Sequence, residues 1–329
     1  MAEMEPIGQM VDRIRSGDKR SASRLMSMVE NGGRESEECL RVLRTQPGRC
    51  HIIGVTGWPG VGKSTLIGRI AGAFLQQNKQ VGIIAVDPTS PLSGGSLLGD
   101  RERMRGIDGD ERLFIRSMAT RGYLGGISGA TDAFIRIMEA MGKEVIIVET
   151  VGVGQDQVAV SSVVDTVVMT VIPGMGDYLQ ALKAGIMELG DIFVVNKADR
   201  KGVEEVVVDL KMIMGMSERR HAWNPPIVKT VATEKDGIDE LMAEIERHRA
   251  HIGKSGQLLA KRRSAVKFEI VETLKARFFD LLNERTGFEE RLDRYAQQVL
   301  DGKIDRYILA ESILEEAGIG ISKKENRDE

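Results

Sequence analysis

One short segment of this 329-residue chain has the residue types that bind phosphate groups. It fits the pattern GxxxxGK followed by Ser or Thr, and it comprises Gly57, Trp58, Pro59, Gly60, Val61, Gly62, Lys63, Ser64 and Thr65. An apolar run precedes it and a helical pattern follows, so its backbone N–H groups can face phosphate oxygens at the start of a helix. We expect Lys63 to neutralise the β- and γ-phosphates, Ser64 to bind Mg²⁺ and Thr65 to lie near the α-phosphate. The segment predicts a nucleotide-binding loop.

A second polar segment, Asn196-Lys197-Ala198-Asp199, indicates which base the nucleotide carries. It follows the apolar run 192–195, and ligands bind at the carboxyl ends of strands in open parallel sheets. The Asp199 carboxylate can accept hydrogen bonds from guanine N1–H and the 2-amino group, whereas adenine offers no such pair of donors. We expect Asn196 to brace the loop and Lys197 to lie along the base. Backbone groups after the next strand are expected to touch the base, at Val231, Ala232 and Thr233.

Carboxylates at the ends of other apolar runs suit a metal ion and the γ-phosphate. Glu149 follows the run 145–148, and we expect it to hold Mg²⁺ directly or through water. The N–H of Gly152 is placed to meet the γ-phosphate, which is the arrangement of a switch loop that hydrolysis releases. Asp87 and Asp100 are further candidates on the Mg²⁺ side. The predicted metal ligands are therefore Ser64, Asp87, Asp100 and Glu149, and the residues expected to act in the chemistry are Lys63, Asp100, Glu149 and Gly152.

Two further features each allow two interpretations. Residues 88–109 are glycine-rich and charged, as a mobile switch or a plain surface loop would be. Within them, Arg101, Arg103 and Arg105 are either charge stabilisers or part of a solvated basic face. His248 and His251 have a spacing that can hold a metal on a helix, but no third ligand is near them in the sequence. A solvated helix face is the favoured interpretation for the histidines.

The composition excludes several classes of function. Hydrophobic residues make up 42 % and charged residues 29 %, and the net charge of −3 gives no reason to expect nucleic acid or an anionic membrane as a partner. Aromatic residues are scarce at 4 %, which argues against base-stacking surfaces. Cys39 and Cys50 are too few for a disulfide scaffold. We see no secretory signal and no apolar stretch of membrane-spanning length, so we expect a cytoplasmic location.

The residues above must be positioned by short β-branched runs that alternate with helical stretches. The runs lie at 51–56, 81–86, 144–149, 165–171, 191–196 and 227–230, with a further one at 113–117. Their near-continuous apolar character indicates strands that are covered on both faces. The sequence predicts an α/β fold of the P-loop nucleotide-binding class, with a mostly parallel central sheet flanked by helices.

Helical patterns extend this region at both ends. Apolar positions at 7–14 and 22–29 form two helical stripes, and Pro47-Gly48 marks a boundary. We expect an N-terminal helical extension at 1–47, a G domain at 48–253 and a C-terminal helical arm at 254–329. One stripe in the arm repeats at steps of four, through Val266, Ile270, Leu274, Phe278 and Leu282. This stripe either packs on the G domain or pairs with a second subunit. An apolar stripe shows that a helix face is covered but does not show which surface covers it.

Taken together, these motifs resemble the MeaB/ArgK/MMAA branch of the G3E P-loop GTPases. The resemblance rests on residues 149–155, on 173–177 with Gln180, Lys183 and 185–188, on 191–199, and on 87–90 with 94–101. It spans almost the whole chain, including both helical extensions. The Glu in place of the usual Asp at position 149 separates the chain from Ras-like proteins.

The resemblance implies a GTP-hydrolysing, Mg²⁺-dependent chaperone for an adenosylcobalamin-dependent acyl-CoA mutase, typically methylmalonyl-CoA mutase. Such proteins gate the loading of intact cofactor and the removal of damaged cobalamin, and the adenosyltransferase that supplies the cofactor is a further partner. The family is usually homodimeric through its C-terminal arm. The segment from Pro173 to Lys183 matches the part that responds to the mutase. The implied regulatory positions are Gln155, Asp177, Gln180 and Lys183.

The expected reaction is an in-line attack of water on the γ-phosphate of GTP. The sequence has no clear counterpart of an activating glutamine or arginine finger, so intrinsic turnover is expected to be slow, and a partner that completes the charge shell would add ~10³–10⁵-fold. Two alternatives use the same phosphate-binding loop. One is a P-loop kinase or ATP-driven transport accessory, and the other is a nickel-insertion GTPase, whose usual metal-binding sites are richer in histidine and cysteine than the four His and two Cys here.

Overall fold

The structure is a computed structural model, and it describes residues 6–32, 34–43, 50–87, 107, 109–119, 126–149, 162–175, 190–215 and 223–319. The chain divides into two compact units, Met1–Glu269 and Ile270–Glu329. None of the helices within the described ranges has both the length and the apolarity needed to cross a membrane.

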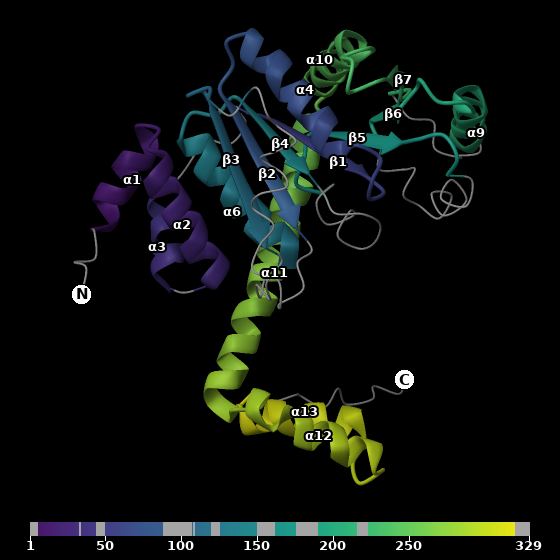
Figure 1. The fold of residues 1–329 in the computed structure, drawn as a ribbon. Helices are drawn as coiled ribbons and strands as arrows, with labels where there is room; N and C mark the ends of the chain where they lie inside the picture. Colours follow the sequence, from purple (N-terminus) through teal and green to yellow (C-terminus); the bar gives the residue numbers. More distant parts are fainter. Residues whose placement is uncertain are drawn as a thin grey trace. The chain divides into compact units, whose positions relative to one another are not determined.

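The first unit is built on one parallel sheet (Figure 1). Among the described residues it has seven strands, β1 (His51–Gly57), β2 (Val81–Asp87), β3 (Leu113–Ala119), β4 (Val145–Glu149), β5 (Thr166–Val171), β6 (Ile192–Asn196) and β7 (Ile227–Thr230). Their order across the sheet is β3-β2-β4-β1-β5-β6-β7, and every neighbouring pair is parallel. The predicted fold class is confirmed. The carboxyl ends of all these strands meet at one edge, where the phosphate-binding segment follows the central strand β1.

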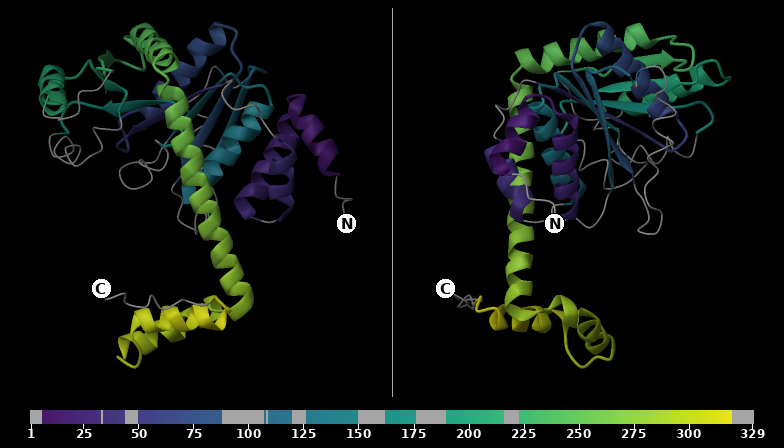
Figure 2. Two further views of the ribbon diagram at one scale, coloured as in Figure 1. Left: turned by 180° about the vertical axis from the view of Figure 1, so that it is seen from behind. Right: turned by 60° about the vertical axis from the view of Figure 1, so that its left-hand side comes forward.

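Helices cover both faces of the sheet, as the continuous apolar strands require. Residues of one parity along the strands, such as Ile53, Val55 and Val168, pack against α4 (Lys63–Gln76) and α10 (Ile238–Lys254). Residues of the other parity pack against α6 (Gly126–Ala140) or, over β5 and β6, against α9 (Val203–Gly215). Figures 1 and 2 show α4 and α10 together over one face, and α6 over the other.

The N-terminal extension forms three helices, α1 (Ile7–Arg15), α2 (Lys19–Asn31) and α3 (Arg34–Val42). They join the core on the α6 face through both predicted stripes, and Ile14 and Leu25 are fully buried. The break between the first two helices lies at Gly17 and Asp18, where the Asp18 carboxylate accepts a 2.7 Å hydrogen bond from the Ser21 N–H and caps α2.

A buried polar network lies at the amino ends of β1, β5 and β6. His51 Nε2 is 2.8 Å from the Thr166 hydroxyl, which is 2.9 Å from His248 Nδ1, and His248 Nε2 is 3.3 Å from an Asp191 carboxylate oxygen. His248 is only 1 % exposed, so its interpretation as part of a solvated face was wrong, whereas His251 is half-buried. No group of three or more His, Cys, Asp or Glu side chains able to hold a metal occurs within the described residues.

The second unit continues α11 (Gln257–Thr286) and adds α12 (Leu292–Leu300) and α13 (Arg306–Glu316). The turn after α11 falls at Gly287, whose φ is +56°, and Arg285 donates a 2.6 Å hydrogen bond to the carbonyl of Ala317. Large apolar side chains remain exposed here, including Leu274, Leu300 and Tyr307. Of the stripe predicted at steps of four, the described side chains are exposed except Leu282, which is buried.

Candidate nucleotide-binding site

The phosphate-binding segment connects β1 to α4 through three glycines in the left-handed region. Their φ angles are +144° at Gly57, +81° at Gly60 and +95° at Gly62. A Cβ atom at Gly57 would lie 2.3 Å from the carbonyl oxygen of Thr170, and one at Gly62 would lie 2.6 Å from the Asn196 side-chain nitrogen. The segment therefore needs glycine at both ends, for conformation and for space.

The Lys63 ammonium is held inside this loop. Its Nζ donates to the carbonyl oxygens of Gly57 at 2.9 Å and Trp58 at 3.3 Å, and the residue is buried. Burial lowers the pKa of Lys63, while the nearby Glu149 carboxylate acts in the opposite direction. A polyphosphate would supply the negative charge that best offsets this desolvation.

Ser64 and Glu149 are brought together at the edge of the sheet. In the register of β1 and β4, Val55 lies beside Glu149, so the strand ends directly next to the start of α4. The Ser64 hydroxyl donates a 3.0 Å hydrogen bond to Glu149 Oε1. Ser64 is buried and Glu149 is half-buried. Hydroxyl and carboxylate oxygens are hard donors that suit Mg²⁺, so this pair fits the predicted metal position.

Asn196 joins the base-recognition segment to the phosphate-binding segment. Its Nδ2 donates to the carbonyl of Val61 at 2.8 Å, and its Oδ1 accepts from the Thr230 hydroxyl at 3.0 Å and the Ala232 N–H at 3.2 Å. The side chain is 2 % exposed, so these bonds are shielded from water. One amide thus fixes the ends of β1, β6 and β7 relative to one another.

Lys197 and Asp199 of the base-recognition segment lie nearer to solvent than Asn196. Lys197 has a φ of +56°, and its Nζ donates a 2.7 Å hydrogen bond to the carbonyl of Gly60. Asp199 is exposed in the turn after β6, at the same edge as the phosphate-binding segment. Its carboxylate is accessible to a base that lies along Lys197.

Arg69 is a residue of this site that the sequence did not reveal. It lies on α4, and it donates 2.7 Å hydrogen bonds from Nε to the carbonyl of Ala232 and from its terminal nitrogen to the carbonyl of Thr233. A planar guanidinium suits two such acceptors at once. The loop is tight as well, because a Cβ atom at Gly237 would lie 1.9 Å from the carbonyl oxygen of Lys229. No motif marks Arg69; its place in the helix after the phosphate-binding segment was the only available signal.

Several predicted site residues lie outside the described residues. These are Asp100, Gly152, Gln155, Asp177, Gln180 and Lys183, together with the three arginines at 101, 103 and 105. Asp87 is the last residue of β2, which pairs with β4, so its backbone lies at the same edge of the sheet as Glu149. The roles predicted for all these residues remain predictions.

Comparison with known proteins agrees with this geometry. A family model described as methylmalonyl Co-A mutase-associated GTPase MeaB matches residues 22–286. A putative GTPase of Pyrococcus abyssi is 42 % identical over 327 residues, covering 97 % of this chain and 100 % of the relative. The methylmalonic aciduria type A homolog, mitochondrial, of Mus musculus is 34 % identical over 259 residues, covering 77 % of this chain and 62 % of that protein.

A solved structure extends the agreement to the fold. The crystal structure of an LAO/AO transport system kinase superposes with a TM-score of 0.70 at 25 % identity, covering 94 % of this chain and 96 % of the other. The phosphate-binding segment, the Ser64–Glu149 pair and the Asn196 brace thus stand in a chain whose relatives are named GTPases. The chain belongs to the MeaB family of GTPases, which are hydrolases acting on GTP.

Proposed function

We propose that this protein is a GTP-dependent switch that serves an adenosylcobalamin-dependent acyl-CoA mutase. The family description names methylmalonyl-CoA mutase as the associated enzyme, and this match carries the proposal. The Mus musculus relative is named after methylmalonic aciduria, which is consistent with the same enzyme. In this role the protein gates the loading of intact cofactor and the removal of damaged cobalamin. The adenosyltransferase that supplies the cofactor is a second proposed partner.

GTP, and GDP after hydrolysis, would bind along the carboxyl edge of the sheet. The Lys63 ammonium is placed to meet the β- and γ-phosphates, beside backbone N–H groups at the start of α4. Ser64 and Glu149 are placed to hold Mg²⁺, with Asp87 and Asp100 as further proposed ligands; the ion would neutralise charge on the phosphate oxygens. The base would lie along Lys197 and Asp199, next to the loop that Asn196 and Arg69 hold.

Hydrolysis would proceed by in-line attack of water on the γ-phosphate. The contact between Ser64 and Glu149 couples the start of α4 to the end of β4, and the chain continues from β4 into the segment with Gly152 and Gln155. Loss of the γ-phosphate would change that segment and report the state of the nucleotide. The mutase would accelerate the reaction by completing the charge shell around the phosphate.

A homodimer formed through the C-terminal arm is also part of this proposal. Exposed large apolar residues are frequent on the described part of the arm, among them Leu274, Phe279 and Leu292. So many large apolar side chains exposed on one segment support a protein–protein contact there. The proposed boundaries at 1–47, 48–253 and 254–329 assign this surface to the arm.

A nucleotide-dependent pull-down tests the switch. The full-length protein, immobilised with GDP or with a non-hydrolysable GTP analogue, is mixed with extract of the native cell, and the retained proteins are identified by mass spectrometry. We expect a cobalamin-binding acyl-CoA mutase to be retained, in amounts that differ between the two nucleotides. Retention of no cobalamin-dependent enzyme in either state would reject the proposed partner while leaving the GTPase assignment intact.

A further inference from the structure

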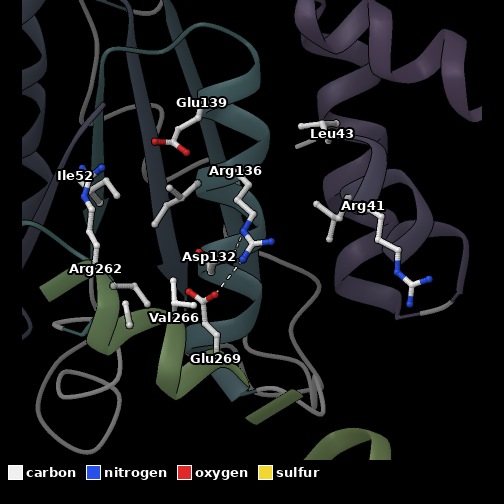
Figure 3. Close-up of a pocket in the computed structure, with 13 residues that line it drawn as sticks. Arg41, Leu43, Ile52, Asp132, Arg136, Glu139, Arg262, Val266 and Glu269 are labelled. Carbon is white, nitrogen blue, oxygen red and sulfur yellow. Dashed lines mark hydrogen bonds and ion pairs between the residues drawn. The ribbon is translucent and has the colours of Figure 1, made fainter. Parts of the chain in front are cut away.

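A cavity of ≈ 500 Å³ lies on the α6 face of the sheet, away from α4 and the nucleotide edge. It is bounded by the end of α3, by α6 and by the first turns of α11 (Figure 3). Its apolar lining consists of Leu40, Leu43, Ile52, Ile135, Val163, Ala265 and Val266. The volume is within the range of small-molecule sites, which is about 300–1,000 Å³.

An acidic pair shares one guanidinium within this cavity. Arg136 Nε lies 2.6 Å from Asp132 Oδ2, and its terminal nitrogen lies 3.0 Å from Glu269 Oε2. The side chains of Asp132 and Glu269 are only 21 % and 14 % exposed. Figure 3 shows the three side chains converging, Asp132 and Arg136 from α6 and Glu269 from α11. Two carboxyl groups therefore face one positive charge in a mostly apolar wall.

Among the described residues that line the cavity, the other charged groups do not supply the missing positive charge. Arg262 pairs with both carboxylate oxygens of Asp165, at 3.1 and 2.8 Å, and donates to the carbonyl of Cys50. Glu139 accepts a 2.8 Å hydrogen bond from the Cys50 thiol, which adds a third carboxyl group to the lining. Arg41 is exposed, and its guanidinium points away from the acidic pair in Figure 3.

Burial and the shared charge together set the protonation of the pair. Burial, and then the charge and hydrogen bond of Asp132, raise the pKa of Glu269 to about 8. Near neutral pH the pair therefore holds one proton between its two carboxyl groups. A ligand that brings its own positive charge can take the place of this proton, whereas an anionic ligand would meet no free guanidinium at the acidic pair.

We propose that this cavity binds a small organic ammonium ion with an apolar chain. The ammonium donates hydrogen bonds to Asp132 and Glu269, and the chain lies against Ile135 and Ala265. On binding, Glu269 releases its proton to solvent, so that two carboxylates face the guanidinium of Arg136 and the ligand cation. This site is independent of the proposed switch function, because its residues take no part in the nucleotide edge.

Calorimetric titration of the full-length protein with hexylammonium chloride tests the site. Hexanol and sodium hexanoate have matched chains with a neutral and a negative head group. We expect hexylammonium to bind at one site per chain and the other two to bind at least about tenfold more weakly, since a charge-assisted hydrogen bond contributes about a factor of ten or more. Equal binding of hexanol, or no binding of hexylammonium, would overturn the proposal.

Proton release separates this site from a general affinity for cations. In two buffers of different protonation enthalpy near pH 7, hexylammonium should release about one proton per ligand bound, and near pH 9 about none, because the acid has then already ionised while an alkylammonium remains charged. Affinity should rise with pH up to about 8 and then level off. Binding without proton release near pH 7 would contradict the assignment to this pair.

Two substitutions locate the ligand. Glu269→Gln and Asp132→Asn each remove one carboxylate with little change of shape, and each should weaken hexylammonium binding about 10- to 100-fold and abolish proton release. Glu246→Gln is the matched control, because Glu246 pairs with Arg249 on an exposed part of α10 and its side chain is 46 % exposed. Unchanged binding in both cavity variants would reject the site. If one variant fails to fold, the other variant and the proton release of the unmodified protein still show whether hexylammonium binds at this pair.

Discussion

The nucleotide edge and the α6-face cavity differ in the sign of the charge that they hold. At the nucleotide edge, backbone carbonyl groups of Gly57 and Trp58 hold a lysine, whose positive charge suits a polyanion. In the cavity, Asp132 and Glu269 share a single guanidinium, so the two carboxyl groups can still bind a cation. The two proposed ligand sites of this unit thus differ in charge, and a sheet with helices on both faces separates them. The difference predicts that substitutions in one site leave the other unchanged.

The largest expected effect is that of Lys63→Ala. This substitution removes the cation nearest the proposed phosphate position, so single-turnover GTP hydrolysis should fall by about 100- to 1,000-fold. Hexylammonium binding in the cavity should not change. Lys79→Ala is the control, because Lys79 pairs with Glu144 at the other end of α4 and its side chain is 40 % exposed. Hydrolysis by Lys63→Ala at the rate of the control would remove Lys63 from the mechanism.

Asp199→Ala should have the next largest effect, and it should act on the base rather than on the phosphates. Loss of the carboxylate leaves two guanine donors unpaired, so affinity for GDP should fall by about 10- to 100-fold, while the weak affinity for ADP should stay the same. Asp209→Ala, in an exposed position on α9, should change neither. Competition binding with a fluorescent guanine nucleotide measures both constants. An equal loss for both nucleotides would show that Asp199 does not read the base.

Arg69→Ala should have a smaller effect on the same measurement. Its two hydrogen bonds to the carbonyls of Ala232 and Thr233 position the base loop but do not touch the nucleotide, so GDP should dissociate about tenfold faster. Arg69→Lys keeps the charge and loses the planar fork, and it should recover only part of the effect. Stopped-flow release of the fluorescent nucleotide provides the rates. A wild-type release rate in Arg69→Ala would assign the guanidinium a role outside nucleotide retention.

The last expected effect is on the pH dependence of stability rather than on the nucleotide. Because the pKa of Glu269 is raised to about 8 in the folded state, the neutral acid is favoured by folding. This contribution is fully present below the unfolded pKa, and it is lost as the pH rises toward about 8. Urea denaturation between about pH 5 and 8 measures how the free energy of unfolding falls as the pH rises. This fall should be less steep in Glu269→Gln than in the unmodified protein or in Glu246→Gln. Parallel curves for all three proteins would contradict the raised pKa.

The nucleotide edge could be predicted from the sequence because its residues occur in short contiguous segments. Gly57 to Thr65 and Asn196 to Asp199 carry their own spacing, and the apolar runs before them were sufficient to predict β1 and β6. Even the weaker run at 113–117 forms a strand, Leu113–Ala119, because it completes the edge of a sheet that is buried on both faces. Local sequence patterns were enough for prediction wherever one contiguous segment contained both the secondary-structure element and the functional residues.

The remaining features depend on packing between distant segments. Asp132 and Glu269 are far apart in sequence and meet only because α6 and α11 lie side by side at the cavity, and Arg69 acquires a role only because α4 lies next to the base loop. His248 was assigned to a solvated face because no third metal ligand is near it in the sequence. It is buried because α10 brings it against Thr166 and Asp191 at the amino ends of the strands.

Control of GTP hydrolysis by a mutase is the central proposal for this protein. Single-turnover hydrolysis by the full-length protein, measured with and without a purified adenosylcobalamin-dependent methylmalonyl-CoA mutase from the same cell, tests it directly. We predict slow hydrolysis by the protein alone and an acceleration of at least about 10³-fold by the mutase, comparable to completion of the charge shell in other GTPases. Fast hydrolysis alone that no such mutase changes would contradict the account.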